Sequence, residues 1–378
     1  MDNNGDWSCS HLDMLCVSND VTPEKIHELI SDNNNKYVNK TDNYGEIALH
    51  HLCSNFFFEP YYKDNYVKSI LELINAGSEI NCLNNKMLTP LQNLCMNNTN
   101  IDISYVKYIS KQNNQIKAVT LLLNNGAFIN IKTSFNETLL HLVCSRRNPD
   151  EKLMNILIKN GVELNAKDNF GDTALHKICK NNNSNKECIA VLLENNVNIN
   201  IQNNKGKTPL HCIFNTQNLN NELIELFLKR IKQKNLLIHL KDDKGKTPLH
   251  YLCKNNNECT MVFLNIYNIE LIINDKDNDG NTPLHCFFKS IVNVNYLPYS
   301  FYVKNKKNII DQMLLLLNKG ASLNIKNNDN EKPFNTLQNK NMFEYNERVF
   351  EFIKIKKKLI KKNCLFINDL CNIIYDYQ

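Results

Sequence analysis

The sequence contains no apolar run that approaches 18 residues, the length at which a transmembrane helix becomes a candidate. Its N-terminus, MDNNGDWSCS, lacks the basic segment and the following apolar stretch of a signal peptide. The sequence also lacks a phosphate-binding loop, a G-x-S-x-G motif, and any lone Cys–His pair outside the repeated segments described below. These absences predict a soluble, non-enzymatic protein that is not secreted and lies in the cytoplasm, with entry into the nucleus left open.

One phrase recurs along the chain and is clearest as KDDKGKTPLHYLC (241–253) and KDNDGNTPLHCFF (276–288). Further copies stand at 41–53, 83–95, 132–144, 167–179, 202–214 and 326–338. Successive copies are 42, 49, 35, 35, 39, 35 and 50 residues apart, measured at the motif histidine or its replacement: His50, Gln92, His141, His176, His211, His250, His285 and Asn335. A spacing in this range together with T-P-L-H is typical of ankyrin repeats.

The chain therefore resembles the ankyrin-repeat family from about Leu12 to about Lys340, with about eight recognisable repeats and a degenerate first one at 12–39. The predicted fold is all-α, an ankyrin-repeat solenoid of about nine repeats over residues 1–340. A short helical C-terminal segment is expected at 341–378. Each repeat should bury its apolar side only against its neighbours.

Each part of the phrase suits a local structure. Asp242 and Gly245 suit a tight turn, because glycine tolerates a positive φ. Thr247 and Pro248 suit the N-cap and the first position of the helix that follows. A second amphipathic helix is expected to end at a residue in the left-handed C′ position, which is glycine or its usual substitute asparagine: Gly126, Gly161, Asn196 and Gly320. The many asparagine pairs and triples fall in the turns between helices.

The motif histidines recur with the repeat period, which a catalytic residue has no reason to do. The resemblance to the ankyrin family implies instead that residues such as His250 and His285 join neighbouring turns by hydrogen bonds.

Several of the 14 cysteines follow the motif position by three residues: Cys53, Cys95, Cys144, Cys179 and Cys253. Cysteine behaves as a small hydrophobe and suits a site where two helices approach closely. The alternative is a row of His-x-x-Cys zinc half-sites. Zinc needs four converging ligands, whereas neighbouring pairs would lie about 10 Å apart by the usual spacing of packed helices. We therefore expect reduced, buried cysteines, no metal and no cofactor.

Three repeats carry insertions, at 56–66, 97–115 and 287–308. Insertions in repeat arrays often lie on the binding face. Two of these insertions are rich in aromatic residues, which are common hot spots of protein interfaces: Phe56, Phe57, Phe58, Tyr61, Tyr62, Tyr66, Tyr296, Tyr299, Phe301 and Tyr302. We predict that they contact a partner protein. The alternative is that they cover extended helix ends as small satellite cores.

Basic residues concentrate in KIKKKLIKKN (354–363), in a chain with a net charge of +5. Because lysine alternates there with isoleucine and leucine, we interpret the segment as a solvated helix face rather than a nucleic-acid contact. Neither a nucleic acid nor a membrane is an expected partner.

The chain ends in CLFINDLCNIIYDYQ (364–378). The long ankyrin array, the Asn-, Lys- and Ile-rich composition and this short C-terminal segment together resemble the poxvirus ankyrin-repeat family. Members of that family end in a truncated F-box-like segment, the PRANC module, which recruits the Skp-type adaptor and the cullin scaffold of a ubiquitin ligase.

The F-box core reads Leu-Pro-x-Glu-Leu and, three residues later, Ile-Leu. In this chain Phe366 takes the place of the first leucine, and Ile367 replaces the proline. Asp369, Leu370 and Ile374 take the places of the glutamate, the second leucine and the isoleucine. The resemblance implies that these residues bind the adaptor. The alternative is a capping helix that shields the last repeat.

The predicted function is protein binding without catalysis. The resemblance implies a poxviral host-range or immune-evasion factor that binds a host protein along its ankyrin array and serves as substrate adaptor of a cullin-type ubiquitin ligase. The alternative is an ankyrin scaffold that sequesters its partner and has no link to a ligase.

Overall fold

The computed structural model of the chain describes residues 10–18, 20–33, 35–55, 63–96, 105–181, 186–216, 221–234, 237–255, 259–266, 269–293, 311–313 and 315–337. Regular structure within these residues is entirely helical, which confirms the predicted all-α fold. By its internal contacts the chain divides into two compact units, Met1–Asn204 and Lys205–Gln378. No helix in the described ranges is both long enough and apolar enough to cross a lipid bilayer.

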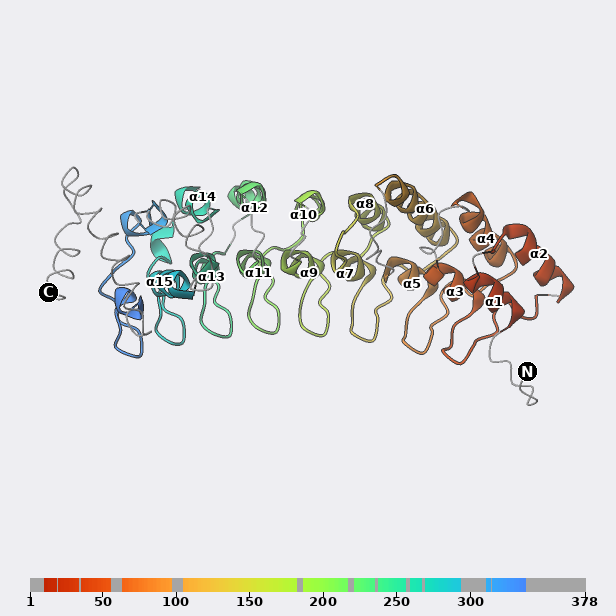
Figure 1. Ribbon diagram of the computed structural model, residues 1–378, viewed down its shortest axis with the longest axis horizontal. Coiled ribbons are helices and arrows are strands. Elements are labelled where there is room, and N and C mark those ends of the chain that lie inside the picture. The colour runs from red at the N-terminus through yellow and green to blue at the C-terminus, as the bar shows by residue number, and fades with distance from the viewer. Residues whose placement is uncertain are drawn as a thin grey trace. The chain divides into compact units, whose positions relative to one another are not determined.

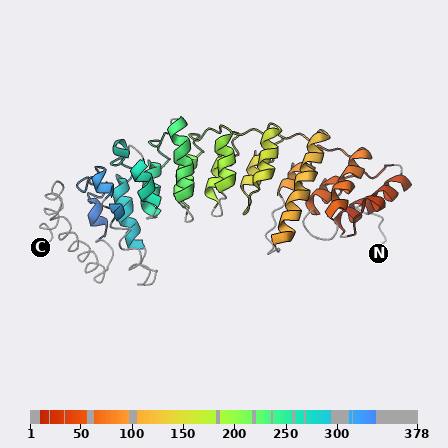
Figure 2. The same ribbon diagram turned by 90° about the horizontal axis from the view of Figure 1, so that it is seen from above.

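The first unit stacks its helices in two layers (Figure 1). The layer nearer the projecting turns contains α1 (His11–Val17), α3 (Ala48–Asn55), α5 (Pro90–Met96), α7 (Leu139–Cys144) and α9 (Ala174–Lys180). The second layer contains α2 (Pro23–Asp32), α4 (Lys63–Asn75), α6 (Tyr105–Asn124), α8 (Glu151–Lys159) and α10 (Lys186–Glu194), which lie side by side in Figure 2. Each helix contacts the next helix of its own layer, so neighbouring helix pairs bury each other's apolar sides.

The second unit has the same arrangement. Its first layer contains α11 (Pro209–Phe214), α13 (Pro248–Asn255), α15 (Pro283–Asn293) and the 3₁₀ helix η3 (Pro333–Leu337), each in contact with the next. In the second layer α12 (Asn221–Lys234) contacts α14 (Cys259–Ile266), which is followed by the 3₁₀ helix η1 (Ile269–Leu271). Residues 311–313 and 315–318 are also helical.

Helices of the first layer begin at the threonine of the repeated phrase, as predicted. Thr173 and Thr208 are N-caps with extended backbones, and their hydroxyls accept hydrogen bonds from the backbone N–H groups of His176 and His211. Pro209 is the first residue of α11, where its missing N–H leaves no hydrogen bond unmade.

Second-layer helices are followed by the predicted left-handed residues. The φ angles are +91° at Gly126, +82° at Gly161 and +93° at Gly320, and Asn196 adopts 62°. These residues let the chain turn back toward the next projecting turn.

The core consists of the apolar residues that the repeats share. The motif leucines are at most 1% exposed: Leu49, Leu91, Leu140, Leu175, Leu210, Leu249 and Leu284. The cysteines three residues after the motif position are fully buried free thiols: Cys53, Cys95, Cys144, Cys179 and Cys253. Burial raises the pKa of Cys95 to about 11, so this group stays a neutral thiol. The cysteines therefore fill space between helices, as the sequence predicts.

Asparagine side chains join neighbouring repeats at fixed positions. The Asn81 side chain donates to the carbonyl of Gly126 (2.9 Å) and accepts from the backbone N–H of Phe128 (2.7 Å). Further asparagines make the same pair of bonds to the next repeat: Asn39, Asn130 and Asn274. These residues therefore link repeats as well as forming turns.

All three insertions contribute residues to helices. Helix α4 begins at Lys63, inside the insertion at 56–66. Helix α6 begins at Tyr105, inside the insertion at 97–115, and α15 continues to Asn293, inside the insertion at 287–308. The helix pair α1 and α2 begins at His11 and ends at Asp32, and so coincides closely with the degenerate first repeat expected at 12–39. Residues 338–378 lie outside the described residues, so the expected boundary between 340 and 341 stays a prediction.

Candidate protein-interaction surface

Five of the motif histidines use both ring nitrogens to hold turns together. The backbone N–H of Thr247 donates to Nδ1 of His250 (3.1 Å), and Nε2 donates to the carbonyl of Asn281 in the next repeat (3.0 Å). This pattern requires a neutral ring, and burial lowers the pKa of His250 to about 4, although the bond to Asn281 opposes the shift. His250 therefore has no free nitrogen for a metal or a proton transfer.

Other motif histidines make the same link to the next repeat, through the carbonyl that precedes its N-cap position. The bonds from Nε2 to this carbonyl are His50 to Leu88 (3.0 Å), His141 to Asp172 (2.9 Å), His211 to Lys246 (3.0 Å) and His285 to Glu331 (3.1 Å). The family resemblance implies that these histidines join neighbouring turns by hydrogen bonds, and the structure confirms it.

The turn that precedes each first-layer helix projects from the layer (Figure 1) and is called a finger here. The described fingers of the first unit are residues 42–46, 84–88, 133–137 and 168–172. In the last of these, Oδ1 of Asp168 accepts the N–H groups of Phe170 and Asp172, both at 2.8 Å. Oδ2 of Asp168 lies 2.7 Å from the ammonium of Lys177 in α9. The Asp168 carboxylate therefore both closes its finger and ties it to a helix.

The ion pair of Asp168 extends to the neighbouring finger. The Lys177 ammonium also lies 2.9 Å from the Glu137 carboxylate. Burial opposes the charged form of Asp168, yet the hydrogen bond from Lys177 and the backbone donors hold its pKa below the ordinary value. The Lys177 ammonium therefore bridges the carboxylates of two neighbouring fingers.

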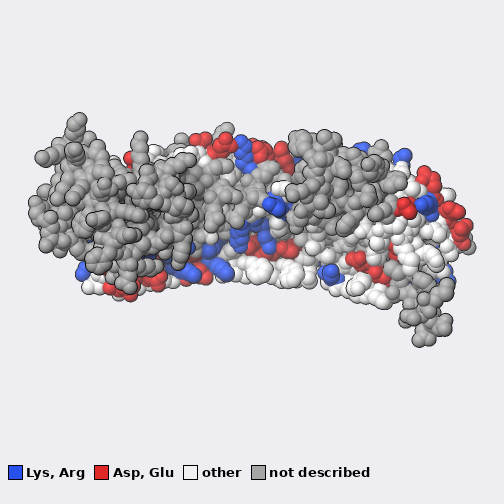
Figure 3. All heavy atoms as spheres, in the orientation of Figure 1, with Lys and Arg blue, Asp and Glu red and all other residues white. Residues whose placement is uncertain are grey.

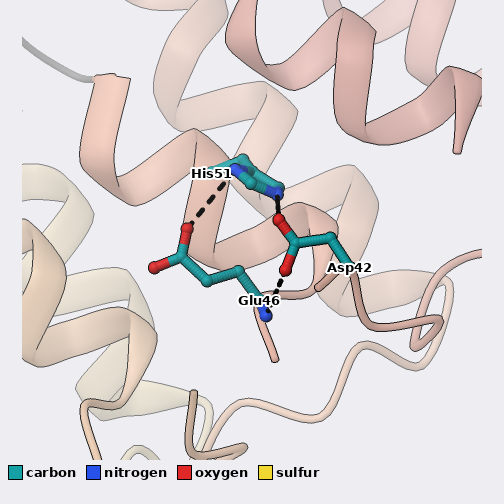
Figure 4. Close-up of side chains that lie close together, drawn as sticks. All are labelled: Asp42, Glu46 and His51. Carbon is teal, nitrogen blue, oxygen red and sulfur yellow. Dashed lines mark hydrogen bonds and ion pairs between the residues drawn. The ribbon is translucent and has the colours of Figure 1, made fainter. Parts of the chain in front are cut away.

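Asp42, Glu46 and His51 form a second cluster, in which one atom of each lies within 4.8 Å of the others (Figure 4). Nε2 of His51 lies 3.2 Å from Asp42, and Nδ1 lies 3.5 Å from Glu46. The two nitrogens thus face different carboxylates, whereas a metal would need one nitrogen and both carboxylates turned to one point. His51 and Lys177 each directly follow a motif histidine, so we interpret this cluster as a contact between a finger and the helix that follows it. The expectation of no metal site stays a prediction.

Charged side chains of both signs are interspersed over the described residues on the face drawn in Figure 3. A nucleic-acid-binding face typically concentrates Lys and Arg in one stripe. Acidic side chains lie among the basic ones on this face, so the described residues here do not show that pattern.

Most site residues predicted from the sequence lie outside the described residues. These are Phe56, Phe57, Phe58, Tyr61, Tyr62, Tyr296, Tyr299, Phe301 and Tyr302 of the insertions, and Phe366, Asp369, Leu370 and Ile374 of the C-terminal segment. Tyr66 is described and lies in α4 rather than in a loop, because this helix already begins at Lys63. The Tyr66 side chain is half-buried, and burial raises the pKa of its hydroxyl well above the ordinary value. The partner-binding and adaptor-binding roles of these residues stay predictions.

The finger tips carry exposed apolar side chains that the sequence interpretation missed. The exposed fractions are 70% at Tyr44, 49% at Met87, 60% at Phe135 and 62% at Phe170. In each finger the first residue closes the turn, because its side chain accepts backbone N–H groups of the finger; these turn-closing residues are Asp42, Asn84, Thr133 and Asp168. Tyr44, Phe135 and Phe170 stand two positions after the turn-closing residue, and Met87 stands three positions after it. The recurrence of large apolar residues at the tip of a solvated turn was the signal available in the sequence.

Residues 140–236 and 214–297 match a family model described as ankyrin repeats in three copies. Among solved structures, the chain is similar to the ankyrin repeat domain of Bcl-3, described as a unique member of the IkappaB protein family. The identity is 17%, the match covers 64% of this chain and 92% of that chain, and the TM-score is 0.48. No curated protein matches the sequence.

The helix pairs, the fingers and the bonded histidines define a stacked repeat protein with an all-α fold. The repeats within residues 140–297 match a family model of ankyrin repeats. Ankyrin repeats indicate an interaction with other proteins, so the exposed fingers are the candidate contact surface.

Proposed function

We propose that this chain is a non-enzymatic adaptor that captures another protein on its ankyrin repeats. The observation that carries the proposal is that the histidine and cysteine side chains of the repeats stabilise the fold. The motif histidines are bonded through both nitrogens, and the cysteines of the helix contacts are buried thiols. Large apolar side chains at the fingers of the first unit are exposed instead, as in a surface that a partner covers.

The finer role that we propose is that of a poxviral host-range or immune-evasion factor in the host cytoplasm. Its support is the resemblance of the array, the composition and the C-terminal segment to the poxvirus ankyrin-repeat family. In this role the array selects a host protein and the C-terminal segment joins it to a ubiquitin ligase.

The contact with the ligase would be made by one face of a C-terminal helix. Phe366, Leu370 and Ile374 are spaced at i, i+4 and i+8, which places them on one side of a helix. Such a face suits burial against a Skp-type adaptor, which binds the cullin in turn.

Affinity purification from cells, followed by mass spectrometry, tests both parts of the proposal. The full chain is compared with a chain that ends at Asn363. We expect the full chain to recover a host protein together with a Skp-type adaptor and a cullin. The shortened chain should recover the host protein alone, because its ankyrin repeats are intact.

The outcomes separate capture from ligase recruitment. Recovery of a host protein by both chains, with no ligase component in either, would leave sequestration as the function. Absence of any specifically recovered protein from both chains would contradict the binding role itself.

A further inference from the structure

Four consecutive fingers of the first unit carry a large exposed apolar side chain at the tip: Tyr44, Met87, Phe135 and Phe170. This set is called the tip ridge here. Backbone bonds hold neighbouring tips together, since the Tyr44 carbonyl accepts from Asn85 (2.8 Å) and the Phe135 carbonyl accepts from Asn169 (3.0 Å). Between the second and third fingers, the Gln92 side chain of α5 donates to the carbonyl of Ile131, which precedes the third finger (2.9 Å). The ridge is therefore a fixed row.

The turn itself does not require apolar side chains at these tips. In the second unit the residues two positions after the turn-closing residue are Lys244, Asp279 and Asp329, and all three are exposed. Polar residues thus fit the same place in the same phrase. The apolar residues of the tip ridge need another reason, and exposed apolar groups in a contiguous row commonly mark a binding surface.

Met87 gives a second, independent indication. Its φ is 59°, in the left-handed region, at the position where other fingers have Gly45 (φ 70°) or Gly171 (φ 73°). A bulky residue in this region is strained. Folding would be easier with glycine there, so the exposed methionine side chain serves something other than folding.

The acidic groups of these fingers are turned toward side chains of the helices that follow them. Asp42 and Glu46 contact His51, while Glu137 and Asp168 contact Lys177. A fifth acidic side chain, in the last finger, is paired with a lysine of α9. The carboxylate side chains of the first unit's fingers are at most 20% exposed, so they are poorly placed to contact a positively charged partner.

Lysines remain on the outside of the same fingers. Lys86 lies in the second finger, and Lys40, Lys132 and Lys167 precede the other three, all exposed. Lys132 lies 3.3 Å from Glu163, and the ammonium of Lys167 donates to a backbone carbonyl. A partner on the tip ridge thus meets apolar side chains flanked by positive charge.

We propose that the tip ridge binds an extended segment of a partner protein that alternates apolar with acidic side chains. This inference rests on the proposed protein-binding function. Neighbouring repeats are about 10 Å apart by the usual spacing of packed helices. An extended polyproline II segment presents a side chain to the same face every three residues, which is about 9 Å. One apolar side chain of the segment therefore meets each finger, and its acidic groups meet the lysines.

Binding of synthetic peptides to the full chain tests this proposal by fluorescence anisotropy. The probe is a labelled peptide of repeated Leu-Pro-Glu triplets, and the controls are peptides of Leu-Pro-Lys and Ser-Pro-Glu triplets. We expect the Leu-Pro-Glu peptide to bind at least about tenfold more tightly than either control. Its affinity should fall as salt is added, because salt screens the exposed lysines.

Matched variants locate the site. Phe135→Ser combined with Phe170→Ser should weaken binding of the Leu-Pro-Glu peptide about tenfold. Phe128→Ser is the control, because Phe128 is 62% exposed in the same unit but lies outside the fingers. It should change the affinity by less than about twofold. Unchanged thermal unfolding of each variant shows that the surface alone has changed.

Equal binding of the Leu-Pro-Glu and Leu-Pro-Lys peptides, no binding of either, or an equal loss in Phe128→Ser would overturn the proposal. The same variants in the cell-based purification separate this inference from the proposed function. A host protein that is still captured in full by the ridge variant would leave the protein-binding function in place and refute the tip ridge as its site.

Discussion

The side-chain amide of Gln92 donates to the carbonyl of Ile131 at 2.9 Å, and its oxygen accepts from the backbone N–H of Thr89 at 2.8 Å. Gln92 stands where other repeats carry a bonded histidine. The amide reproduces the acceptor and the donor of a neutral imidazole. Gln92 therefore keeps one acceptor and one donor at this position without the acid–base chemistry of histidine, although its donor reaches Ile131 rather than Glu137, the residue before the next N-cap.

This equivalence predicts the effect of substitutions at His250. His250→Ala leaves the Thr247 N–H and the Asn281 carbonyl without their partner, so it should lower the free energy of unfolding by about 2–4 kcal/mol. His250→Gln should restore both bonds and stay within about 1 kcal/mol of the wild type. Urea unfolding followed by circular dichroism measures both values. Equal losses in the two variants would contradict the hydrogen-bonding role.

The buried histidines also predict a dependence of stability on pH. Burial lowers the pKa of His250 from 6.5 to about 4, and lowers those of His50, His141 and His285 in the same direction. The unfolded chain therefore binds more protons between these values. This contribution to stability is present above about pH 6.5 and is lost as the pH falls toward about 4, and it reaches about 3 kcal/mol for His250.

Unfolding midpoints measured across this pH range test the prediction. The chain with His250→Gln is the control, because glutamine does not titrate. It should lose less stability on acidification than the wild type. A parallel decline in both proteins would show that His250 makes no such contribution.

The motif leucines should be essential for the stack. Leu249→Ala removes a fully buried side chain between α11 and α15, and the resulting cavity should cost about 2–5 kcal/mol. Neighbouring repeats should loosen together, because each buries its apolar side only against the next. Thermal unfolding with hydrogen exchange checks both effects. An unchanged midpoint would contradict the stacked architecture.

Met87→Gly should stabilise the protein and weaken binding at the same time. Glycine relieves the strained left-handed backbone, which should raise the free energy of unfolding by about 1 kcal/mol. The loss of the exposed side chain should weaken partner capture. Chemical denaturation gives the first value and quantitative affinity purification gives the second. A destabilised variant would refute the strain, and unchanged capture would remove Met87 from the binding surface.

The C-terminal segment has its own test. Leu370→Asp would bury an unpaired carboxylate in the proposed contact with the Skp-type adaptor, which such a contact cannot tolerate. Recovery of the adaptor and cullin should be lost, while capture of the host protein persists. If the segment only caps the array, the same change should weaken capture of the host protein, with no ligase component recovered even by the wild type.

Much of the fold could be predicted from the sequence, because the phrase around His250 specifies a turn, an N-cap, a helix start and a bonded histidine over a few neighbouring residues. Hydrogen bonds between residues of different repeats were harder to predict. The two bonds of Asn81 depend on which backbone groups the next repeat brings to it, and no single segment contains that information. The asparagines were predicted only to lie in turns for the same reason.

The candidate surface was predicted less well than the fold. We predicted that the aromatic residues of the insertions bind a partner because they are clustered in the sequence. The apolar residues of the tip ridge occur once per repeat and come together only when the repeats stack. The exposure of Phe135 and Phe170 could not be read from their type, because aromatic residues are usually buried. Helix α4 includes Tyr66 since helix boundaries depend on tertiary contacts as well as on local sequence.

The central claim is that the fingers of the ankyrin repeats contact a captured protein. Cross-linking of the full chain to its captured partner, followed by mass spectrometry, tests it most directly. Exposed lysines are the reporters: Lys86, Lys132 and Lys167 at the fingers, and Lys152 and Lys159 on α8 in the second layer. We predict cross-links from the partner to the finger lysines and not to those of α8. Cross-links confined to α8, or no captured protein at all, would contradict the claim.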